Sequence, residues 1–285
     1  MKIAVLSGKG GTGKTFIAAN LAAAASQSTY FDCDVEEPNG HLFFRPENVQ
    51  SEPVQIIVPE VDQNKCDGCK WCVDFCKFKA LAYVPGHLMV FEEMCHSCGG
   101  CILFCPQKAL TEKLRPIGRI EKGFSDNTLV YSGFLNPGEE SGVPIIEELL
   151  RKPIHGETVL IDSPPGSSCS VMESIIQADY CLLVAESTSF GVHNLEVARK
   201  LVQVFNKPYG VIVNKSFPGD HLIGDYCRQQ GIKFIGSIPF DQKLAQELSR
   251  GRLVARENKH FRRIFQEYLT IIAQEVSLSE TAARS

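Results

Sequence analysis

The chain has 285 residues and a formal net charge of −4, and 44% of its residues are hydrophobic against 22% charged. This composition is ordinary for a globular protein, and the negative net charge gives no support to a general nucleic-acid-binding role. No run of 18 or more apolar residues occurs and the first residues lack the pattern of a secretory signal, so we expect a cytoplasmic protein without a membrane helix.

The first 60 residues begin with strand and helix signals. A short apolar run over residues 3–6 predicts a strand, and a glycine-rich loop follows it. An alanine-rich segment over residues 15–25 then predicts a helix, and a second strand is expected over residues 29–31.

Residues 61–111 differ from the rest of the chain by their cysteine content. The chain holds 12 cysteines, and those from Cys66 to Cys105 form a dense group. Without an export signal, such a group indicates metal or cluster binding rather than a disulfide framework. Val58-Pro59 before this segment and Arg115-Pro116-Ile117-Gly118 after it are expected to mark its boundaries.

Residues 112–285 return to alternating strand and helix signals. Short apolar runs typical of buried parallel strands occur at 129–131, 158–161, 180–185, 210–213 and 234–238. Helices are expected at 145–150, 195–204, 223–230 and over most of 241–276. We therefore expect an α/β fold, with a mostly parallel sheet flanked by helices, built from residues 1–60 and 112–285. Residues 61–111 would form a small inserted α+β domain.

The cysteine-rich segment contains an internal repeat. Its two copies have the spacing C-x₂-C-x₂-C-x₃-C, from Cys66 to Cys76 and from Cys95 to Cys105. This repeat resembles that of bacterial two-cluster ferredoxins, so residues 61–111 are expected to form a bacterial-ferredoxin-like α+β domain. In those proteins the fourth cysteine of each copy ligates the other [4Fe–4S] cluster. The expected ligands of cluster one are Cys66, Cys69, Cys72 and Cys105, and those of cluster two are Cys95, Cys98, Cys101 and Cys76. Zinc is the alternative, but its four-thiolate sites usually use two separated C-x-x-C pairs.

The glycine-rich loop matches the phosphate-binding pattern G-x-x-x-x-G-K-[ST] and lies between a predicted strand and a predicted helix. Its backbone N–H groups and the helix N-terminus favour phosphate, Lys14 should reach the β- and γ-phosphates, and Thr15 should bind Mg²⁺. The expected nucleotide-binding residues of the loop are Gly8, Lys9, Gly10, Gly11, Thr12, Gly13, Lys14 and Thr15.

The narrower pattern K-G-G-x-G-K-[ST], from Lys9 to Thr15, resembles the deviant Walker A loop of the MinD/ParA family of P-loop ATPases. That family includes the nitrogenase iron protein and the Mrp-type cluster carriers. The segments Asp32-Cys33-Asp34, Asp162-Ser-Pro-Pro-Gly166 and Asn214-Lys215 also resemble family motifs. The resemblance covers the chain outside residues 61–111.

The resemblance implies roles for individual residues. Lys9 would reach the phosphates of a partner subunit in an ATP-dependent homodimer, and Asp34 would orient the attacking water. Asp32 would help to hold Mg²⁺ or the switch loop. Asp162 would lie near Mg²⁺, and Asn214 would face adenine. Lys9, Lys14 and Asp34 are thus the expected catalytic residues, and each aspartate has the plain alternative of capping a turn.

Cys169 is one of the four cysteines outside the repeat. It lies at the offset from Asp162 at which the nitrogenase iron protein carries a ligand to its intersubunit cluster. A second cysteine equivalent to the one which that protein also uses is absent, and packing is the plainer interpretation.

The combined motifs predict an Mg²⁺-dependent ATPase, slow without a partner, that couples its nucleotide state to electron transfer through two [4Fe–4S] clusters. A protein redox partner is then expected, with neither a nucleic acid nor a membrane as partner. One alternative is a MinD-like positioning or scaffold ATPase whose insert senses redox state or docks a partner. Its terminal helix would bind membranes, whereas residues 261–273 fit a closing helix better. The other alternative is an iron–sulfur cluster carrier, which the complete ferredoxin-like wiring disfavours because it favours retention.

Overall fold

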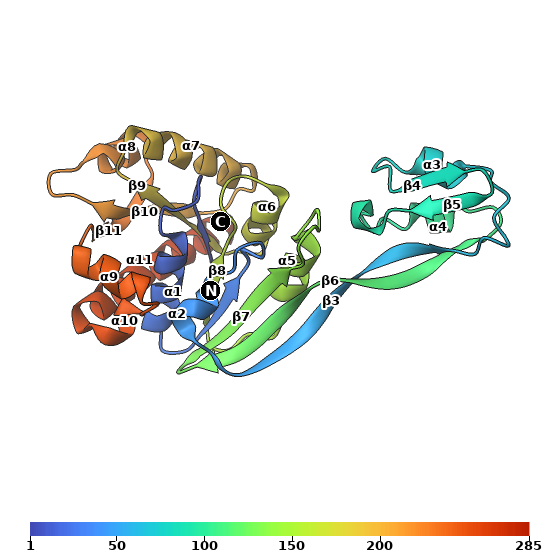
Figure 1. The fold of residues 1–285 in the computed structure, drawn as a ribbon. Helices are drawn as coiled ribbons and strands as arrows, with labels where there is room; N and C mark the ends of the chain where they lie inside the picture. Colours follow the sequence, from blue (N-terminus) through green and yellow to red (C-terminus); the bar gives the residue numbers. More distant parts are fainter. Residues whose placement is uncertain (285) are drawn as a thin grey trace.

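The computed structural model describes residues 1–284. A nine-stranded sheet in the order β11-β10-β9-β1-β8-β2-β7-β6-β3 forms the centre of the molecule, and Figure 1 shows it with a small unit standing apart at the end of two long strands. The pairings from β11 to β7 are parallel, and β7–β6 and β6–β3 are antiparallel. The strands are β1 (Lys2–Leu6), β2 (Ser28–Asp32), β3 (Glu47–Val61), β6 (Leu110–Ser125), β7 (Thr128–Leu135), β8 (Thr158–Asp162), β9 (Tyr180–Glu186), β10 (Tyr209–Ser216) and β11 (Lys233–Pro239).

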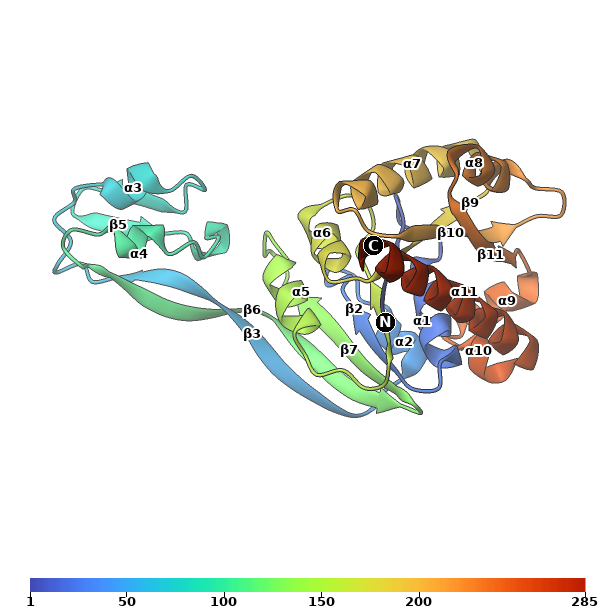
Figure 2. The same cartoon turned by 180° about the vertical axis from the view of Figure 1, so that it is seen from behind.

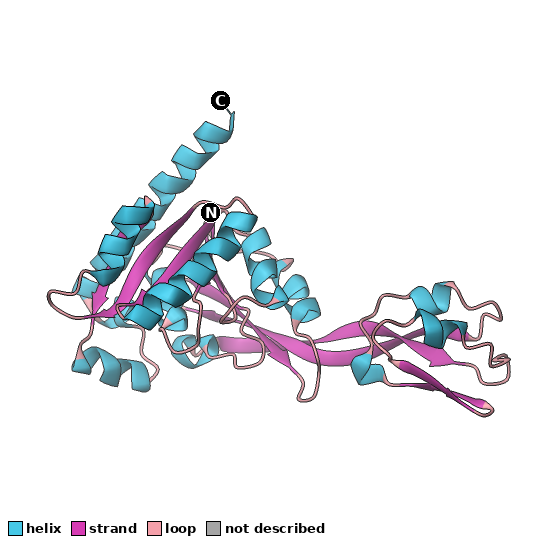
Figure 3. Ribbon diagram, turned by 90° about the horizontal axis from the view of Figure 1, so that it is seen from above, coloured by secondary structure: helices cyan, strands magenta, loops and turns pink. Residues whose placement is uncertain are grey.

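Helices cover both faces of this sheet (Figures 2 and 3). In β1, Ile3 and Val5 pack into one apolar cluster while Ala4 and Leu6 pack into the other, because successive strand side chains point to opposite faces. This two-sided burial explains the continuous apolar runs of the sequence and confirms the expected mostly parallel α/β fold. The first face carries α1 (Lys14–Ala24), α10 (Val254–Glu257) and α11 (Lys259–Arg284), and the second carries α5 (Val143–Leu150), α6 (Cys169–Ile176), α7 (Ser189–Val204) and α8 (Leu222–Gln230).

The terminal helix α11 is part of the core rather than a free amphipathic segment. Phe265 and Ile272 are fully buried and belong to the cluster on the α1 face of the sheet. Two further helices complete the body: the short α2 (Gly40–Phe44) and α9 (Gln242–Ser249). Within residues 1–284, no helix combines the length and the apolar character needed to cross a bilayer.

The largest departure from the sequence analysis is the ribbon formed by β3 and β6. Val58-Pro59 and Arg115-Pro116-Ile117-Gly118 were expected at domain boundaries, but they lie inside these paired strands. Pro59 is tolerated because β3 is the edge strand of the sheet, and Pro116 lies just before the point where β6 gains β7 as a second neighbour. The two prolines therefore lie where the strand has a neighbour on one side only, and they do not mark the ends of the ribbon.

The far end of the ribbon carries residues 62–109 (Figure 1). This unit, which we call the insert, contains α3 (Trp71–Phe75), a hairpin of β4 (Leu81–Val84) and β5 (His87–Val90), a 3₁₀ turn (Glu92–Met94) and α4 (Gly100–Leu103). Its apolar core is small and consists of Cys76, Ala80, Leu81, Leu88 and Cys101 together with Leu110, the first residue of β6.

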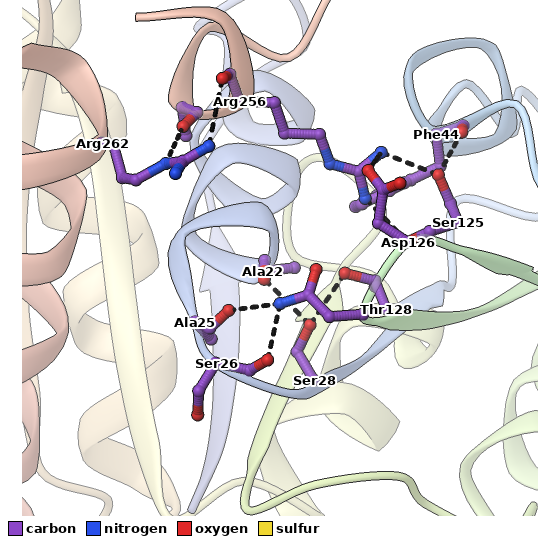
Figure 4. Close-up of polar contacts among 12 residues, drawn as sticks. Ala22, Ala25, Ser26, Ser28, Phe44, Ser125, Asp126, Thr128, Arg256 and Arg262 are labelled. Carbon is purple, nitrogen blue, oxygen red and sulfur yellow. Dashed lines mark hydrogen bonds and ion pairs between the residues drawn. The ribbon is translucent and has the colours of Figure 1, made fainter. Parts of the chain in front are cut away.

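The near end of the ribbon is bound to the body by a polar network (Figure 4). Arg256 of α10 donates to both Oγ and the carbonyl O of Ser125, each at 2.8 Å, and Ser125 Oγ donates to the Phe44 carbonyl. In the adjoining turn, Asn127 Nδ2 donates to the carbonyls of Ala25 and Ser26 at 2.6 and 2.7 Å. These bonds join the turn between β6 and β7 to α1, α2 and α10.

Candidate nucleotide site and cysteine cavities

The loop between β1 and α1 forms one wall of a cavity of about 760 Å³. Gly13 precedes α1 with φ 86°, and a Cβ at this position would lie 2.1 Å from Nδ2 of Asn214, so only glycine fits. Residues Gly10 to Thr15, which were expected to bind the nucleotide, line the cavity; Gly8 and Lys9 do not.

Lys14 is the buried cation at the floor of this cavity. Its side chain is only 6% exposed, and its Nζ lies 2.9 Å from Oδ1 of Asp162 and 4.0 Å from Oδ2 of Asp34. Burial alone would lower the pKa of Lys14, but the attraction and hydrogen bond of Asp162 raise it above its usual value. Oδ2 of Asp162 also accepts a hydrogen bond from the Tyr30 hydroxyl at 2.9 Å. The ammonium group is thus held charged where a phosphate could replace its carboxylate partners.

Asp34 also faces the cavity, from the loop after β2. Partial burial, opposed by Lys14 and reinforced by the negative charge of Asp162, raises its pKa to about 6. Its carboxylate is therefore a hydrogen-bond acceptor above this pH, which a water-orienting role requires.

Asp32 occupies a different environment. It is fully buried and does not line the cavity, and its Oδ2 accepts a hydrogen bond from the Gly40 amide at 2.7 Å while Oδ1 accepts one from the Asp34 amide at 3.3 Å. Burial and the neighbouring Asp162 raise its pKa well above the usual range. Asp32 thus holds the loop from Asp34 to Gly40 in place, and direct binding of Mg²⁺ by it stays a prediction.

Lys9 points away from the cavity and toward its own chain. Its Nζ lies 3.3 Å from Oε2 of Glu186 and 5.2 Å from the centre of the Phe190 ring. The same carboxylate binds Lys215 at 2.6 Å, and Lys215 Nζ also donates to the Gly11 carbonyl at 2.8 Å. Burial would raise the pKa of Glu186, but these two lysines lower it. The expected reach of Lys9 into a partner subunit stays a prediction.

Asn214 supports the loop from behind. Its Nδ2 donates to the Thr12 carbonyl at 2.8 Å, and the residue is buried and outside the cavity lining. Asn214 therefore does not line the cavity in this geometry, and its contact with adenine stays a prediction.

Sequence reasoning missed the outer wall of the cavity. Phe43 and Arg45 from the end of α2 face the segment Leu248–Gly251, and Arg45 Nη2 donates to the Arg250 carbonyl at 2.8 Å. No motif marks these residues, because they come together only through the packing of α2 against the α9–α10 connection.

The eight clustered cysteines line two separate cavities of the insert. One is lined by Cys66, Cys69, Cys72 and Cys105, and the other, of about 260 Å³, by Cys76, Cys95, Cys98 and Cys101. Each set takes three cysteines from one repeat and the fourth from the other repeat. The remaining walls are mainly apolar and include Tyr83 and Leu88 at the first cavity and Phe75 and Phe78 at the second.

The four thiols of each cavity match the donor set of a [4Fe–4S] cluster, and the first cavity, of about 20 Å³, is much smaller than the second. Burial raises the pKa of Cys101 to about 11, so this thiol would be protonated without a bound cation. Within residues 1–284, no three His, Cys, Asp or Glu side chains are gathered closely enough to hold a single metal ion.

Comparisons with known proteins agree with the nucleotide site. Residues 3–254 match the model of the CobQ/CobB/MinD/ParA nucleotide binding domain. An uncharacterized protein of Methanocaldococcus jannaschii is 30% identical over 264 residues, with 90% of this chain and 93% of that protein covered. A protein of Pyrococcus furiosus named iron-sulfur cluster carrier protein is 25% identical, with 87% and 76% covered.

The fold has relatives among solved structures. The septum site-determining protein MinD of Pyrococcus horikoshii, solved with Mg-ADP, superposes with a TM-score of 0.57 at 15% identity, over 94% of this chain and 93% of that one. At this identity the likeness concerns the fold.

Proposed function

The chain belongs to the CobQ/CobB/MinD/ParA nucleotide-binding family and is a P-loop ATPase of the MinD/ParA type, and from this premise we propose that it couples ATP hydrolysis to electron transfer through two [4Fe–4S] clusters. In this proposal the protein works in the cytoplasm as an ATP-dependent homodimer that delivers electrons to a protein partner.

The observation that carries this proposal is the pair of thiol-lined cavities. Four cysteines surround each cavity, and the fourth cysteine crosses between the repeats in both cases. This crossing is the ligand pattern of two-cluster ferredoxins. When bound, the clusters would supply reversible one-electron chemistry. The chain contributes the apolar walls that limit the access of water.

The nucleotide side of the proposal rests on the contacts of Lys14. The hydrolysis consumes ATP and water and yields ADP and phosphate. Lys14 would exchange its Asp162 contact for the β- and γ-phosphates and neutralise charge there, and Thr15 would bind Mg²⁺. Asp34, 4.0 Å from the Lys14 ammonium, would accept a hydrogen bond from the attacking water.

The position of the insert favours a protein partner. The ribbon holds the insert away from the bulk of the body (Figure 1), and its outer side chains include Trp71 and Leu103, which are 62% and 77% exposed. Exposed apolar side chains near redox centres favour contact with another protein.

An anaerobic redox titration followed by EPR tests the proposal. The purified protein is titrated with and without Mg²⁺ and a non-hydrolysable ATP analogue. A nucleotide-dependent shift of about 60 mV or more corresponds to roughly 1.4 kcal/mol of coupling per electron and supports the proposal. Iron content well below about eight per chain after anaerobic reconstitution contradicts it.

Cluster delivery is a second candidate, because relatives over most of this chain carry the name iron-sulfur cluster carrier protein. A transfer assay separates the two functions. Incubation of the loaded protein with an apo-ferredoxin moves iron to the acceptor if the clusters are cargo, and leaves it with the donor if they are resident.

A further inference from the structure

The ribbon leaves the body at an irregular point. Val54 of β3 pairs with Gly118 of β6, but the next residue, Gln55, pairs with Pro116, so Ile117 is an extra residue in β6. Such a bulge bends and twists a ribbon locally. Pairing of β6 with β7 also ends here, at Gly118 and Leu135. The bulge at Ile117 is therefore the position about which the ribbon and insert would pivot.

A tight turn after β7 is attached to this bulge. The amide of Asn136 donates to the Ile117 carbonyl at 2.9 Å, and the amide of Glu139 donates to the Asn136 carbonyl at 3.3 Å. Pro137 and Gly138, the latter with φ 87°, occupy the two central positions, which is the pattern of a type II turn. We call residues 136–142 the hinge loop.

The hinge loop contacts both the ribbon and the insert. Oε1 and Oε2 of Glu139 accept hydrogen bonds from Arg115 Nη1 and Nη2 at 2.6 and 2.7 Å, and these side chains are only 10% and 13% exposed. Glu140 Oε2 lies 3.6 Å from Nε2 of His96, whose ring stacks on Phe78 at 3.8 Å. His96 directly follows Cys95, so the hinge loop reaches the rim of the second cysteine cavity.

On its other side the hinge loop contacts Val35, the neighbour of Asp34 in the nucleotide cavity. Val35, the residue after Asp34, accepts a hydrogen bond on its carbonyl from the Leu135 amide at 2.9 Å. Its buried side chain fits between Gly133 and Gly142, where an added Cβ would lie 2.7 and 2.3 Å from the Val35 methyl groups. A displacement of Val35 therefore displaces the hinge loop, because close-packed groups leave no slack between them.

We propose that the hinge loop is the positioning element that links the nucleotide site to the second cysteine cavity, with Glu139 and Arg115 as its positioning residues. This inference rests on the proposed function and names its regulation. A change at Asp34 on nucleotide binding moves Val35 and the start of the turn. The rigid turn then moves the ribbon, and with it the rim of the cavity, through the largely buried Glu139–Arg115 pair.

The fixed near end of the ribbon makes this route effective. Arg256 and Ser125 hold the turn between β6 and β7 on the body (Figure 4), so a movement cannot spread to that end without breaking their bonds. Motion is then concentrated at the bulge, where β6 has lost its second neighbour.

Amide hydrogen exchange of the cluster-loaded protein, with and without Mg²⁺ and a non-hydrolysable ATP analogue, tests the inference. We expect the analogue to change exchange in residues 136–142 and 93–98 by about threefold or more, in peptides that contact no nucleotide. Glu139→Gln, which keeps the side-chain shape and removes its charge, should reduce the change in 93–98 to less than about 1.5-fold while ATP affinity is retained. Glu147→Gln is the matched control. Glu147 lines the same cavity between the hinge loop and the insert as Glu139, but it pairs with the exposed Arg151 at 3.5 Å.

Two results would overturn the inference. One is unchanged exchange in residues 136–142 of the wild-type chain on analogue binding, and this result stands even if a variant fails to load its clusters. The other is a full response of residues 93–98 in Glu139→Gln. Failure of the proposed function is separately visible, because exchange can respond to nucleotide while the EPR titration shows no shift of the cluster potentials.

Discussion

The body and the insert are stabilised in different ways. The body buries both faces of a nine-stranded sheet and holds its charged groups in prepared contacts such as Lys14–Asp162. The core cluster of the insert has only six buried residues, Leu110 of β6 included; two of them are cysteines, and most other apolar side chains of the insert are partly exposed. A unit of this size needs a metal or similar cross-link for stability. The difference teaches that nucleotide binding is a property of a preformed fold, whereas the fold of the insert should depend on the proposed clusters.

Removal of the clusters is expected to give the largest effect. Iron chelation under denaturant-free conditions should abolish the protection of residues 62–109 against proteolysis and leave the body folded, because cluster binding is coupled to folding of the insert. Limited proteolysis with mass spectrometry measures this. Circular dichroism serves as the control that the helices and strands of the body remain folded. If the insert stays protected without iron, its fold does not depend on clusters, and the contrast with the body is wrong.

Lys14→Ala should abolish nucleotide binding and leave the iron content unchanged. The change removes the proposed phosphate-binding cation and leaves the buried Asp162 without its cationic partner, which costs about 3 kcal/mol or more of folding stability. Isothermal titration with Mg-ATP, iron analysis and thermal unfolding check the three parts. Loss of iron in this variant would refute the independence of the two modules.

Leu160→Ala should lower the free energy of unfolding of the body by about 3 kcal/mol, since Leu160 is completely buried in the central strand β8. Leu88→Ala in the insert is the matched change, and with clusters bound it should leave the body transition where it is. Denaturant titrations followed in each region provide the measurement. Equal destabilisation of both regions by either variant would mean that they unfold as one unit.

The pH dependence of ATP hydrolysis should follow the protonation of Asp34. Its pKa of about 6 predicts that the ATPase rate falls as the pH drops through 6, because a protonated carboxyl group is a weaker hydrogen-bond acceptor and cannot take a proton from water. Rates from pH 5 to 8 test this, and a control reaction in the absence of Mg²⁺ gives the background. If the rate instead falls around a pH far from 6, a residue other than Asp34 orients the water.

Ionisation of Asp34 should support ATP hydrolysis but slightly destabilise the fold. Because the pKa of Asp34 is raised above its usual 3.8, its ionised form opposes folding above pH 6. Asp34→Asn should therefore unfold at higher denaturant concentration than the wild type at pH 7.5, and this advantage should fade between about pH 6 and pH 4. An advantage that persists at pH 4 would point to a packing effect instead.

Local sequence patterns were sufficient for the strands around the nucleotide loop. The apolar runs at 3–6, 158–161 and 180–185 lie within β1, β8 and β9, because strands buried on both faces need apolar side chains at every position. The ribbon was missed because the side chains of β3 are mostly exposed and its pattern is not apolar. Its stability comes from pairing with β6, a partner about 60 residues away in the chain.

By itself, the sequence determined the phosphate-binding loop and the two cysteine repeats, since both depend on the spacing of neighbouring residues. Only the tertiary structure decided that Lys9 pairs with Glu186, that Asp32 holds the loop to Gly40, and that the hinge loop joins Val35 to Arg115. These contacts join segments that are distant in the chain or lie in irregular loops, and no local pattern specifies which distant side chain completes them. The physical reason is that spacing fixes local geometry, whereas packing selects the partners of side chains.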